Sequence, residues 1–157
     1  MTMMLDKYKS VMGQYPSGVT ILTAYDKANN VPVGLTANSF VSVSLNPLLI
    51  LFCIDESASS LAVFEKVNTF GVNILGEDQE EQCFRFASKI EDKFSGQDWE
   101  LSKLSVPILT KSAAILECEK EEEILLGDHT VFVDRVKDVH QNDLKPIVYF
   151  DREVHVI

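Results

Sequence analysis

Short hydrophobic stretches separated by turn-forming residues cover most of the chain. Alternating or continuous apolar runs of this length predict β-strands. Four such runs follow one another with short links rich in Asp, Asn and Pro, at residues 19–25, 31–35, 39–45 and 48–54. Further strands are predicted at residues 70–75, 113–120, 123–127, 130–139 and 145–150. Because tight links favour antiparallel pairing, the pattern predicts a mainly β fold, either an antiparallel sheet or a barrel.

A few helices accompany these strands, and the spacing of apolar residues predicts them at residues 5–12, 59–67 and 78–88. The third begins with Asp78 and Glu81, which have the spacing of a capping box. Residues 89–105 then form a long polar connection. A connection of that length in a compact domain is usually functional or mobile, so we expect it to act as a lid.

Length and charge limit the classes of function. The chain has 157 residues, 46% of them hydrophobic, and shows no low-complexity segment, which predicts one domain over residues 1–157. Its 14 basic and 24 acidic residues give a net charge of −10. This charge opposes binding to nucleic acid and to anionic membranes. The longest apolar run, residues 48–54, is too short to span a bilayer, so a soluble, cytoplasmic protein is expected.

Cysteine, histidine and glycine positions exclude several kinds of site. Neither the cysteines nor the histidines have metal-ligand spacing, which predicts no metal site; they are Cys53, Cys83, Cys118, His129, His140 and His155. The chain also lacks the glycine-rich phosphate loop, the dinucleotide-binding fingerprint and the nucleophile elbow. A small antiparallel barrel must therefore hold any cofactor.

Small neutral side chains gather between two hydrophobic runs at residues 34–47. The part before the strand contains Thr36, Ala37, Asn38 and Ser39, which offer short donors and acceptors without charge. Such groups suit phosphate oxygens, ribityl hydroxyls or the polar edge of a flat heterocycle. Composition alone favours the alternative, a strand and turn rich in Ser and Thr.

Six spaced motifs together resemble the short-chain flavin reductase family, the small components of two-component monooxygenases. The motifs are residues 16–20, 34–40, 42–47, 72–75, 127–130 and 146–150. The resemblance extends from about residue 11 to residue 155 and implies an FMN-binding split β-barrel with a few peripheral helices. It also implies a homodimer with flavin near the subunit interface.

The same resemblance implies an enzyme, an NAD(P)H:flavin oxidoreductase. FMN, or alternatively FAD, would be reduced by NADH or NADPH through direct hydride transfer from nicotinamide C4 to flavin N5. Free flavin and the nicotinamide nucleotide are the expected small-molecule partners, and a monooxygenase is the expected acceptor of reduced flavin. Two alternatives remain: an electron-transfer module with tightly bound FMN and a protein redox partner, and an interaction scaffold that has lost flavin.

The resemblance assigns flavin contacts to two neutral segments. The residues Thr36 to Ser39 match the segment that touches the ribityl and phosphate region and the ring edge. A second set lies before the helix at residues 59–67, where the family binds the flavin phosphate; it comprises Asp55, Ser57, Ser59 and Ser60. Relatives often carry Lys or Arg here, whereas this chain has Glu56 and Ser57. Capping of the helix is the alternative explanation for the serines.

Three further regions carry expected contacts. Phe86 and Ser88 match the segment near the distal part of the flavin or the adenine of FAD, whereas Phe84 is expected in the core. His129 matches a histidine near the flavin ring and the nicotinamide, with acid catalysis as a weaker alternative. The last expected contacts, near the ring, are Tyr149 and Arg152. The aromatic residue usual before His155 is replaced by Val154.

Overall fold

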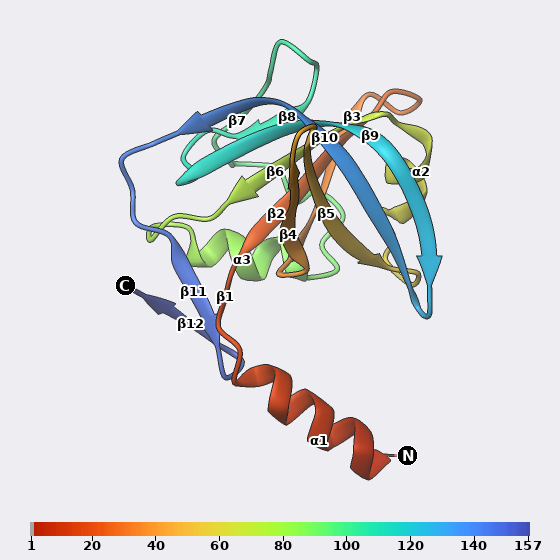
Figure 1. Ribbon diagram of the computed structural model, residues 1–157. Helices are drawn as coiled ribbons and strands as arrows, with labels where there is room; N and C mark the ends of the chain where they lie inside the picture. Colours follow the sequence, from red (N-terminus) through yellow and green to blue (C-terminus); the bar gives the residue numbers. More distant parts are fainter. Residues whose placement is uncertain (1) are drawn as a thin grey trace.

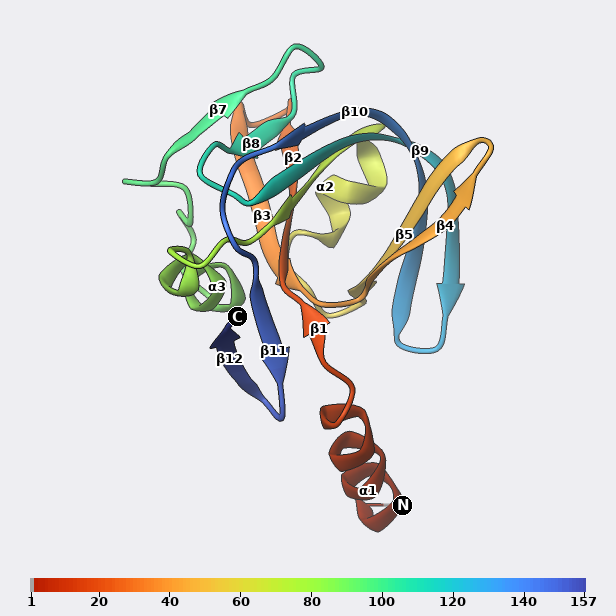
Figure 2. The same ribbon diagram turned by 60° about the vertical axis from the view of Figure 1, so that its left-hand side comes forward.

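The computed structural model describes residues 2–157, and seven of its strands form one antiparallel sheet that curls into a barrel (Figures 1 and 2). These strands are β2 (Thr20–Asp26), β3 (Val31–Ala37), β4 (Phe40–Leu45), β5 (Leu48–Asp55), β6 (Thr69–Ile74), β9 (Ala114–Leu126) and β10 (His129–Gln141). Their order in the sheet is β3-β2-β6-β9-β10-β5-β4. The predicted mainly β fold with antiparallel pairing is confirmed.

Aromatic side chains fill the inside of this barrel. Alternate residues of β5 point inward, and Phe52 stacks on Phe132 of β10 with ring centroids 5.3 Å apart. The short helix α2 (Leu61–Lys66) adds Phe64, whose ring stacks on Phe70 of β6 at 5.2 Å. All four rings are fully buried. Each contributes about 1.5–3 kcal/mol by leaving water, so this cluster fixes the barrel that carries the site.

A second core lies between the barrel and α3 (Glu80–Ala87). Its centre is Phe86, which contacts the ring of Phe94 with centroids 5.0 Å apart. A Cβ atom at Gly34 would lie 3.0 Å from the Phe86 ring, so glycine lets α3 approach β3 closely. The short hairpin of β7 (Trp99–Leu101) and β8 (Pro107–Leu109) borders this core. Phe86 packs inside, and Phe84 is 59% exposed, so the expected core position of Phe84 is wrong.

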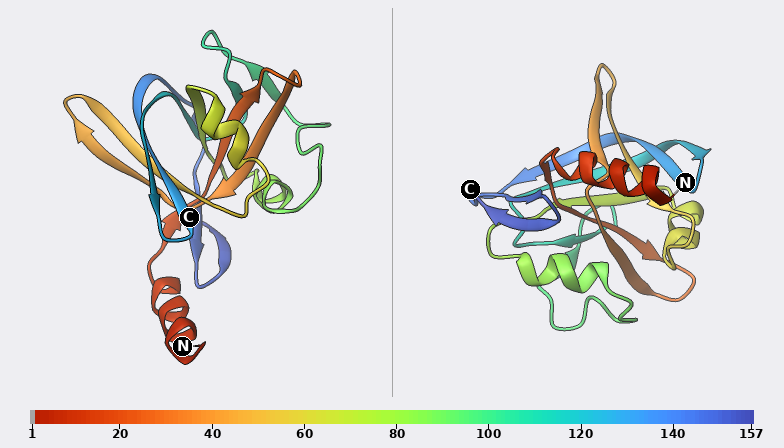
Figure 3. Two further views of the ribbon diagram at one scale, coloured as in Figure 1. Left: turned by 90° about the vertical axis from the view of Figure 1, so that its right-hand side faces the viewer. Right: turned by 90° about the horizontal axis from the view of Figure 1, so that it is seen from below.

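The chain termini form an extension at one end of the barrel. The small sheet there consists of β1 (Ser17–Gly18), β11 (Ile147–Phe150) and β12 (Glu153–Val156). Helix α1 (Thr2–Gly13) buries none of its residues, and both α1 and the β11–β12 hairpin project from the barrel (Figure 3, left view). Within residues 2–157, no helix combines the length and apolar composition needed to cross a bilayer.

Several predicted boundaries change. The strands expected at residues 113–120 and 123–127 are one bent strand, β9, whose pairing with β10 contains register shifts. The predicted capping box is absent, because Gln79 precedes α3 and its side-chain oxygen accepts a hydrogen bond from the Gly76 N–H at 3.0 Å. The short strands β1, β7, β8 and β12 were not predicted, since two to four residues give no measurable alternation.

Contacts with α3 and β3 hold the connection at residues 89–105 in place. The Arg85 side chain donates to the carbonyl oxygen of Lys93 at 2.7 Å. The Lys93 ammonium donates to the carbonyl oxygens of Phe86 at 2.9 Å and Gly34 at 3.2 Å. Burial lowers the pKa of Lys93, and Phe94 is only 4% exposed. The expected lid is therefore a pinned segment in this structure.

Candidate functional site

The link between β3 and β4 carries the neutral segment, and its backbone is held from both sides. The Thr36 hydroxyl donates to the carbonyl oxygen of Cys83 at 2.6 Å, which ties β3 to α3. The Thr20 hydroxyl donates to the carbonyl oxygen of Ala37 at 2.6 Å. Asn38 follows as an exposed residue, and within residues 2–157 its amide side chain makes no hydrogen bond. The segment therefore presents one unused amide from a rigid backbone.

Ser39 differs from its neighbour Asn38 because its hydroxyl is already engaged. It donates to the carbonyl oxygen of Cys53 at 2.8 Å and accepts from the Cys53 N–H at 3.1 Å. These two hydrogen bonds hold the start of β4 against β5. Of the four residues predicted to contact flavin in this segment, Thr36 and Ser39 use their hydroxyls within the fold and Ala37 is buried, so Asn38 is the one with a free polar side chain.

The link from β5 to α2 carries the predicted phosphate contacts. The Asp55 carboxylate accepts from both the Ser57 N–H, at 2.8 Å, and the Ser57 hydroxyl, at 2.7 Å. These hydrogen bonds, with a smaller contribution from His129, hold the pKa of Asp55 below its usual range. Ser60 precedes α2 without capping it through its side chain. Ser59 is exposed, and within the described chain neither the Ser59 nor the Ser60 hydroxyl is bonded.

The start of β10 lies directly beside this link. His129 is paired with Asp55 in the antiparallel register, and its Nδ1 atom lies 2.7 Å from an Asp128 carboxylate oxygen. The Glu56 N–H donates to the Asp128 carbonyl oxygen at 2.9 Å, and the Thr130 hydroxyl donates to the Glu56 carboxylate at 2.8 Å. The fold thus brings Asp55 and His129, which are far apart along the chain, to the same end of the barrel as Ser39.

The other predicted contacts have different surroundings. Phe86 is fully buried, so its ring packs in the core and faces no open surface. Ser88 is the C-terminal cap of α3, and its hydroxyl donates to the Arg85 carbonyl oxygen at 2.6 Å. Tyr149 packs partly against the second core, and Arg152 is exposed at the tip of the β11–β12 hairpin with φ of +64°. These residues are not joined to the Asp55–His129 end of the barrel by any hydrogen bond within residues 2–157.

One unassigned residue in the extension has an unused polar group. Ser17 pairs with Tyr149 in β1 and β11, and its hydroxyl oxygen is buried without a hydrogen-bond partner among the described residues. The motif at residues 16–20 contains Ser17 but gave it no role. The serine adds a donor beside the predicted ring contact.

Two hollows of the surface lie away from the predicted flavin residues. A cavity of about 480 Å³ lies between α3 and the β7–β8 hairpin and is lined by residues that include Gln82, Gln97, Lys111 and Asn142. A second, of about 310 Å³, lies between the β2–β3 turn and α2. Neither contains Asn38, Asp55 or His129. Asn38 and Asp55 are exposed and the His129 side chain is 42% exposed; the surface that carries these three residues is called the open face below.

Residues 12–157 match the family model described as the flavin reductase like domain. The chain is 40% identical over 145 residues to the reductase subunit HsaB of a flavin-dependent monooxygenase from Rhodococcus jostii, covering 92% of this chain and 73% of the relative. Its fold is similar to that of nitrilotriacetate monooxygenase component B from Mycobacterium thermoresistibile, with a TM-score of 0.94 and 33% identity over 99% of this chain and 88% of that one.

A further solved structure is similar over nearly the whole chain. It is the NADH:FAD oxidoreductase SgcE6 from Streptomyces globisporus, in complex with NAD and FAD fragments. The TM-score is 0.90 and the identity 31%, over 96% of this chain and 91% of that one. Some other relatives are longer, and the chain spans about half of their length.

Proposed function

The chain belongs to the flavin reductase-like domain family, and from this premise we propose that it reduces flavin with electrons from a nicotinamide nucleotide. It is an oxidoreductase with the family's split-barrel fold. One observation carries the assignment: the barrel matches, at a TM-score of 0.90, an NADH:FAD oxidoreductase whose complex contains NAD and FAD fragments. The reaction transfers a hydride directly between the nicotinamide and flavin rings, which needs no protein nucleophile.

The residues at the open face fit the neutral parts of a flavin. Asn38 offers an unbonded amide, and the hydroxyls of Ser59 and Ser60 are free to donate. Since Ser57 gives both its N–H and its hydroxyl to Asp55, we assign Ser57 to holding the link and Ser59 and Ser60 to the flavin phosphate. Neutral donors suit an anion beside the Asp55 carboxylate because their hydrogen bonds offset the repulsion between the two charges.

We assign His129 to contact with the ring or nicotinamide rather than to acid catalysis. Its Nδ1 atom is held by Asp128, which fixes the plane of the ring and leaves Nε2 available to a ligand. Tyr149 and Arg152, with Ser17 beside Tyr149, form a second contact region on the extension. The protein's part is then to hold two flat rings together and to keep water from between them.

A second copy of the chain would cover the open face, and we propose a homodimer. Helix α1 buries no residue against its own barrel. Its apolar residues Met3, Met4, Tyr8 and Val11 are each more than half exposed. Apolar residues are also exposed on the β4–β5 hairpin, namely Val41, Val43, Leu45 and Leu48. Exposed apolar surface of this extent marks an interaction site. Flavin would lie where the copies meet.

Names of relatives support the finer choices. One relative is named an FMN reductase that uses NADH, and another is the reductase subunit of a monooxygenase. We therefore propose NADH as the main reductant, with NADPH as the alternative, and a monooxygenase as the acceptor of reduced flavin. FMN and FAD remain alternatives as the flavin. The supply of reduced nicotinamide nucleotide favours the cytoplasm as the place of this reaction.

The proposed function is tested by anaerobic titration of the purified chain and FMN or FAD with NADH and then NADPH. The expected result is bleaching of the flavin absorbance with many turnovers of free flavin per chain. Bound flavin that neither nucleotide reduces would support an electron-transfer module instead, and failure to bind either flavin would overturn both functions. Light scattering on the same sample tests the dimer.

A further inference from the structure

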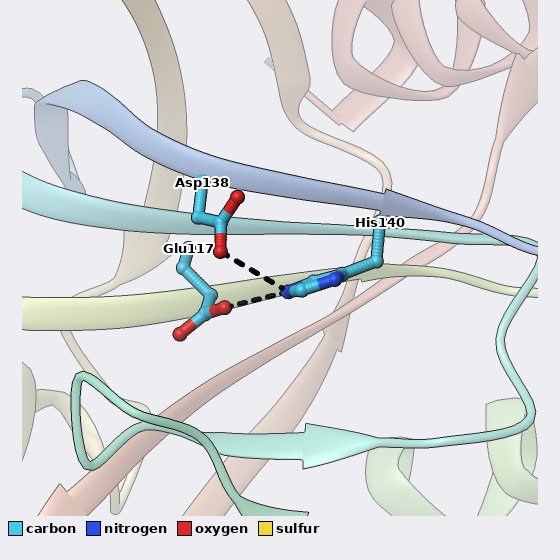
Figure 4. A group of neighbouring side chains, drawn as sticks. All are labelled: Glu117, Asp138 and His140. Carbon is cyan, nitrogen blue, oxygen red and sulfur yellow. Dashed lines mark hydrogen bonds and ion pairs between the residues drawn. The ribbon is translucent and has the colours of Figure 1, made fainter.

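Three chemically reactive side chains converge at a place that the flavin site does not use (Figure 4). Glu117 comes from β9, and Asp138 and His140 come from β10. The His140 Nε2 atom lies 2.7 Å from a Glu117 carboxylate oxygen and 3.7 Å from an Asp138 carboxylate oxygen. One atom from each residue lies within 4.8 Å of the other two.

A break in the strand register creates this group. Val136 is paired with Cys118, whereas Asp138 is paired with Glu117, so Lys137 is an extra residue in β10. Without this bulge Lys137 would lie opposite Glu117. The extra residue moves Asp138 and, two positions later, His140 to the face that Glu117 occupies. Bulges that re-aim side chains in this way are frequent beside functional sites.

Among these three residues, Glu117 gives the clearest evidence that a ligand binds here. Its side chain is only 3% exposed, and its second carboxylate oxygen is buried without a hydrogen-bond partner among the described residues. On the same face, Ile115 packs with Val106 and Ile108, so the surroundings are apolar on one side. A buried carboxyl group with an unsatisfied oxygen is costly unless a proton or a cation compensates it.

We propose that Glu117, Asp138 and His140 bind a divalent transition-metal ion of the Zn²⁺ class. One imidazole nitrogen and two carboxylate oxygens form a ligand set that Zn²⁺ accepts, and water would complete a tetrahedron. Bonds of about 2.0–2.2 Å place tetrahedral ligand atoms about 3.3–3.6 Å apart. The distances of 2.7 and 3.7 Å at His140 therefore need shifts of less than about 1 Å. The ion would take the place of the hydrogen bond between the His140 Nε2 atom and the Glu117 carboxylate.

The proposed metal site is separate from the flavin site along the same strand. His129 begins β10, and His140 lies one residue before its end. An ion bound there would join β9 to β10 across the bulge, where the pairing is irregular. Because the metal binds the folded chain, it should raise the melting temperature. The inference rests on the metal-binding group alone and stands independently of flavin reduction.

The test uses the full chain freed of metal by a chelator and titrated calorimetrically with Zn²⁺. We expect one Zn²⁺ per chain and a higher melting temperature with Zn²⁺ bound. His140→Ala and Asp138→Asn should each weaken Zn²⁺ binding at least about tenfold. Both residues are exposed, so the variants should fold, which circular dichroism checks. The matched control is His155→Ala, because His155 is an exposed histidine whose Nε2 atom lies 3.9 Å from the Glu153 carboxylate.

Three results would overturn the metal site. The first is the absence of stoichiometric Zn²⁺ binding to the unaltered chain. The second is unchanged affinity in both His140→Ala and Asp138→Asn. The third is a thiolate charge-transfer band when Co²⁺ replaces Zn²⁺, since that band would place the ion on a cysteine. None of these measurements depends on flavin or nicotinamide turnover.

Discussion

The Ser39 hydroxyl bridges the backbone of Cys53, donating to its carbonyl oxygen at 2.8 Å and accepting from its N–H at 3.1 Å. The bridge fixes β4 on β5 at the point where the exposed Asn38 leaves the sheet. Two neighbouring residues of similar polarity therefore have different roles. Ser39 holds the backbone, and Asn38 is left to contact a ligand.

This difference predicts opposite effects of two substitutions. Ser39→Ala should lower the free energy of unfolding by about 0.5–1.5 kcal/mol, because the Cys53 carbonyl oxygen loses the Ser39 hydroxyl donor and the Cys53 N–H keeps only the Ser39 carbonyl oxygen, at 3.2 Å. Asn38→Leu should change stability by less than about 0.5 kcal/mol and weaken FMN binding about tenfold, which equals about 1.4 kcal/mol. Urea unfolding and fluorescence titration with FMN measure the two quantities. Equal flavin affinity in Asn38→Leu and the unaltered chain would contradict the assignment of Asn38.

Substitution of the serines before α2 should weaken binding of the flavin phosphate without affecting binding of the flavin ring. Replacing Ser59 and Ser60 together by Ala should weaken FMN binding about tenfold or more, since charge-assisted hydrogen bonds contribute about 1.5–3 kcal/mol each. Riboflavin, which has no phosphate, should bind as before. Ser57→Ala is the matched control, because the Ser57 hydroxyl is donated to Asp55. An equal loss of affinity for FMN and for riboflavin would show that these serines do not bind the phosphate.

Local patterns were sufficient for the strands that bury one face. In β5 the buried residues Ile50, Phe52 and Ile54 alternate with less buried ones, so the predicted strand ends within one residue of the observed one. The sequence also indicated that residues 36–39, just before β4, contact a ligand. It could not predict that Ser39 holds the backbone while Asn38 stays free, because the hydrogen-bond partner of Ser39 lies 14 residues away on another strand.

The errors come from shifts of register. In α3 the helix begins after Gln79, which places Cys83 and Phe86 inside and leaves Phe84 exposed. In β10 the extra residue Lys137 reverses the alternation of sides. A single-residue shift changes the face of every later side chain, and no local pattern marks it. Asp138 and His140 have the spacing of one strand face, but their neighbour Glu117 is distant in sequence.

Lys93 gives a direct test of the pinned segment at residues 89–105. Lys93→Met keeps an unbranched side chain only one atom shorter and removes the hydrogen bonds to the carbonyl oxygens of Phe86 and Gly34. Amide hydrogen exchange should then accelerate in this segment, while the β9–β10 ladder keeps its protection. The matched control is Lys103→Met, because Lys103 is exposed and makes no hydrogen bond within residues 2–157. Equal exchange in all three proteins would mean that other contacts hold the segment.

Asp134 is a fully buried acid on the inner face of β10. Both of its carboxylate oxygens lack hydrogen-bond partners among the described residues. Burial raises the pKa of Asp134 from 3.8 to about 8, and the ammonium of Lys120 offsets only part of this effect. The folded chain therefore binds the Asp134 proton more tightly than the unfolded chain does. Its contribution to stability is complete below about pH 4 and is lost as the pH rises towards 8.

We therefore expect the free energy of unfolding to fall between pH 5 and pH 8, by at most about 4 kcal/mol from this group, since one pKa unit equals about 1.4 kcal/mol. Asp134→Asn cannot ionise and should lose this slope, so the variant gains stability relative to the unaltered chain as the pH rises. Urea unfolding of both proteins across this range isolates the contribution of Asp134, because the histidines titrate in both. Parallel pH profiles would mean that Asp134 is ionised in the folded chain throughout.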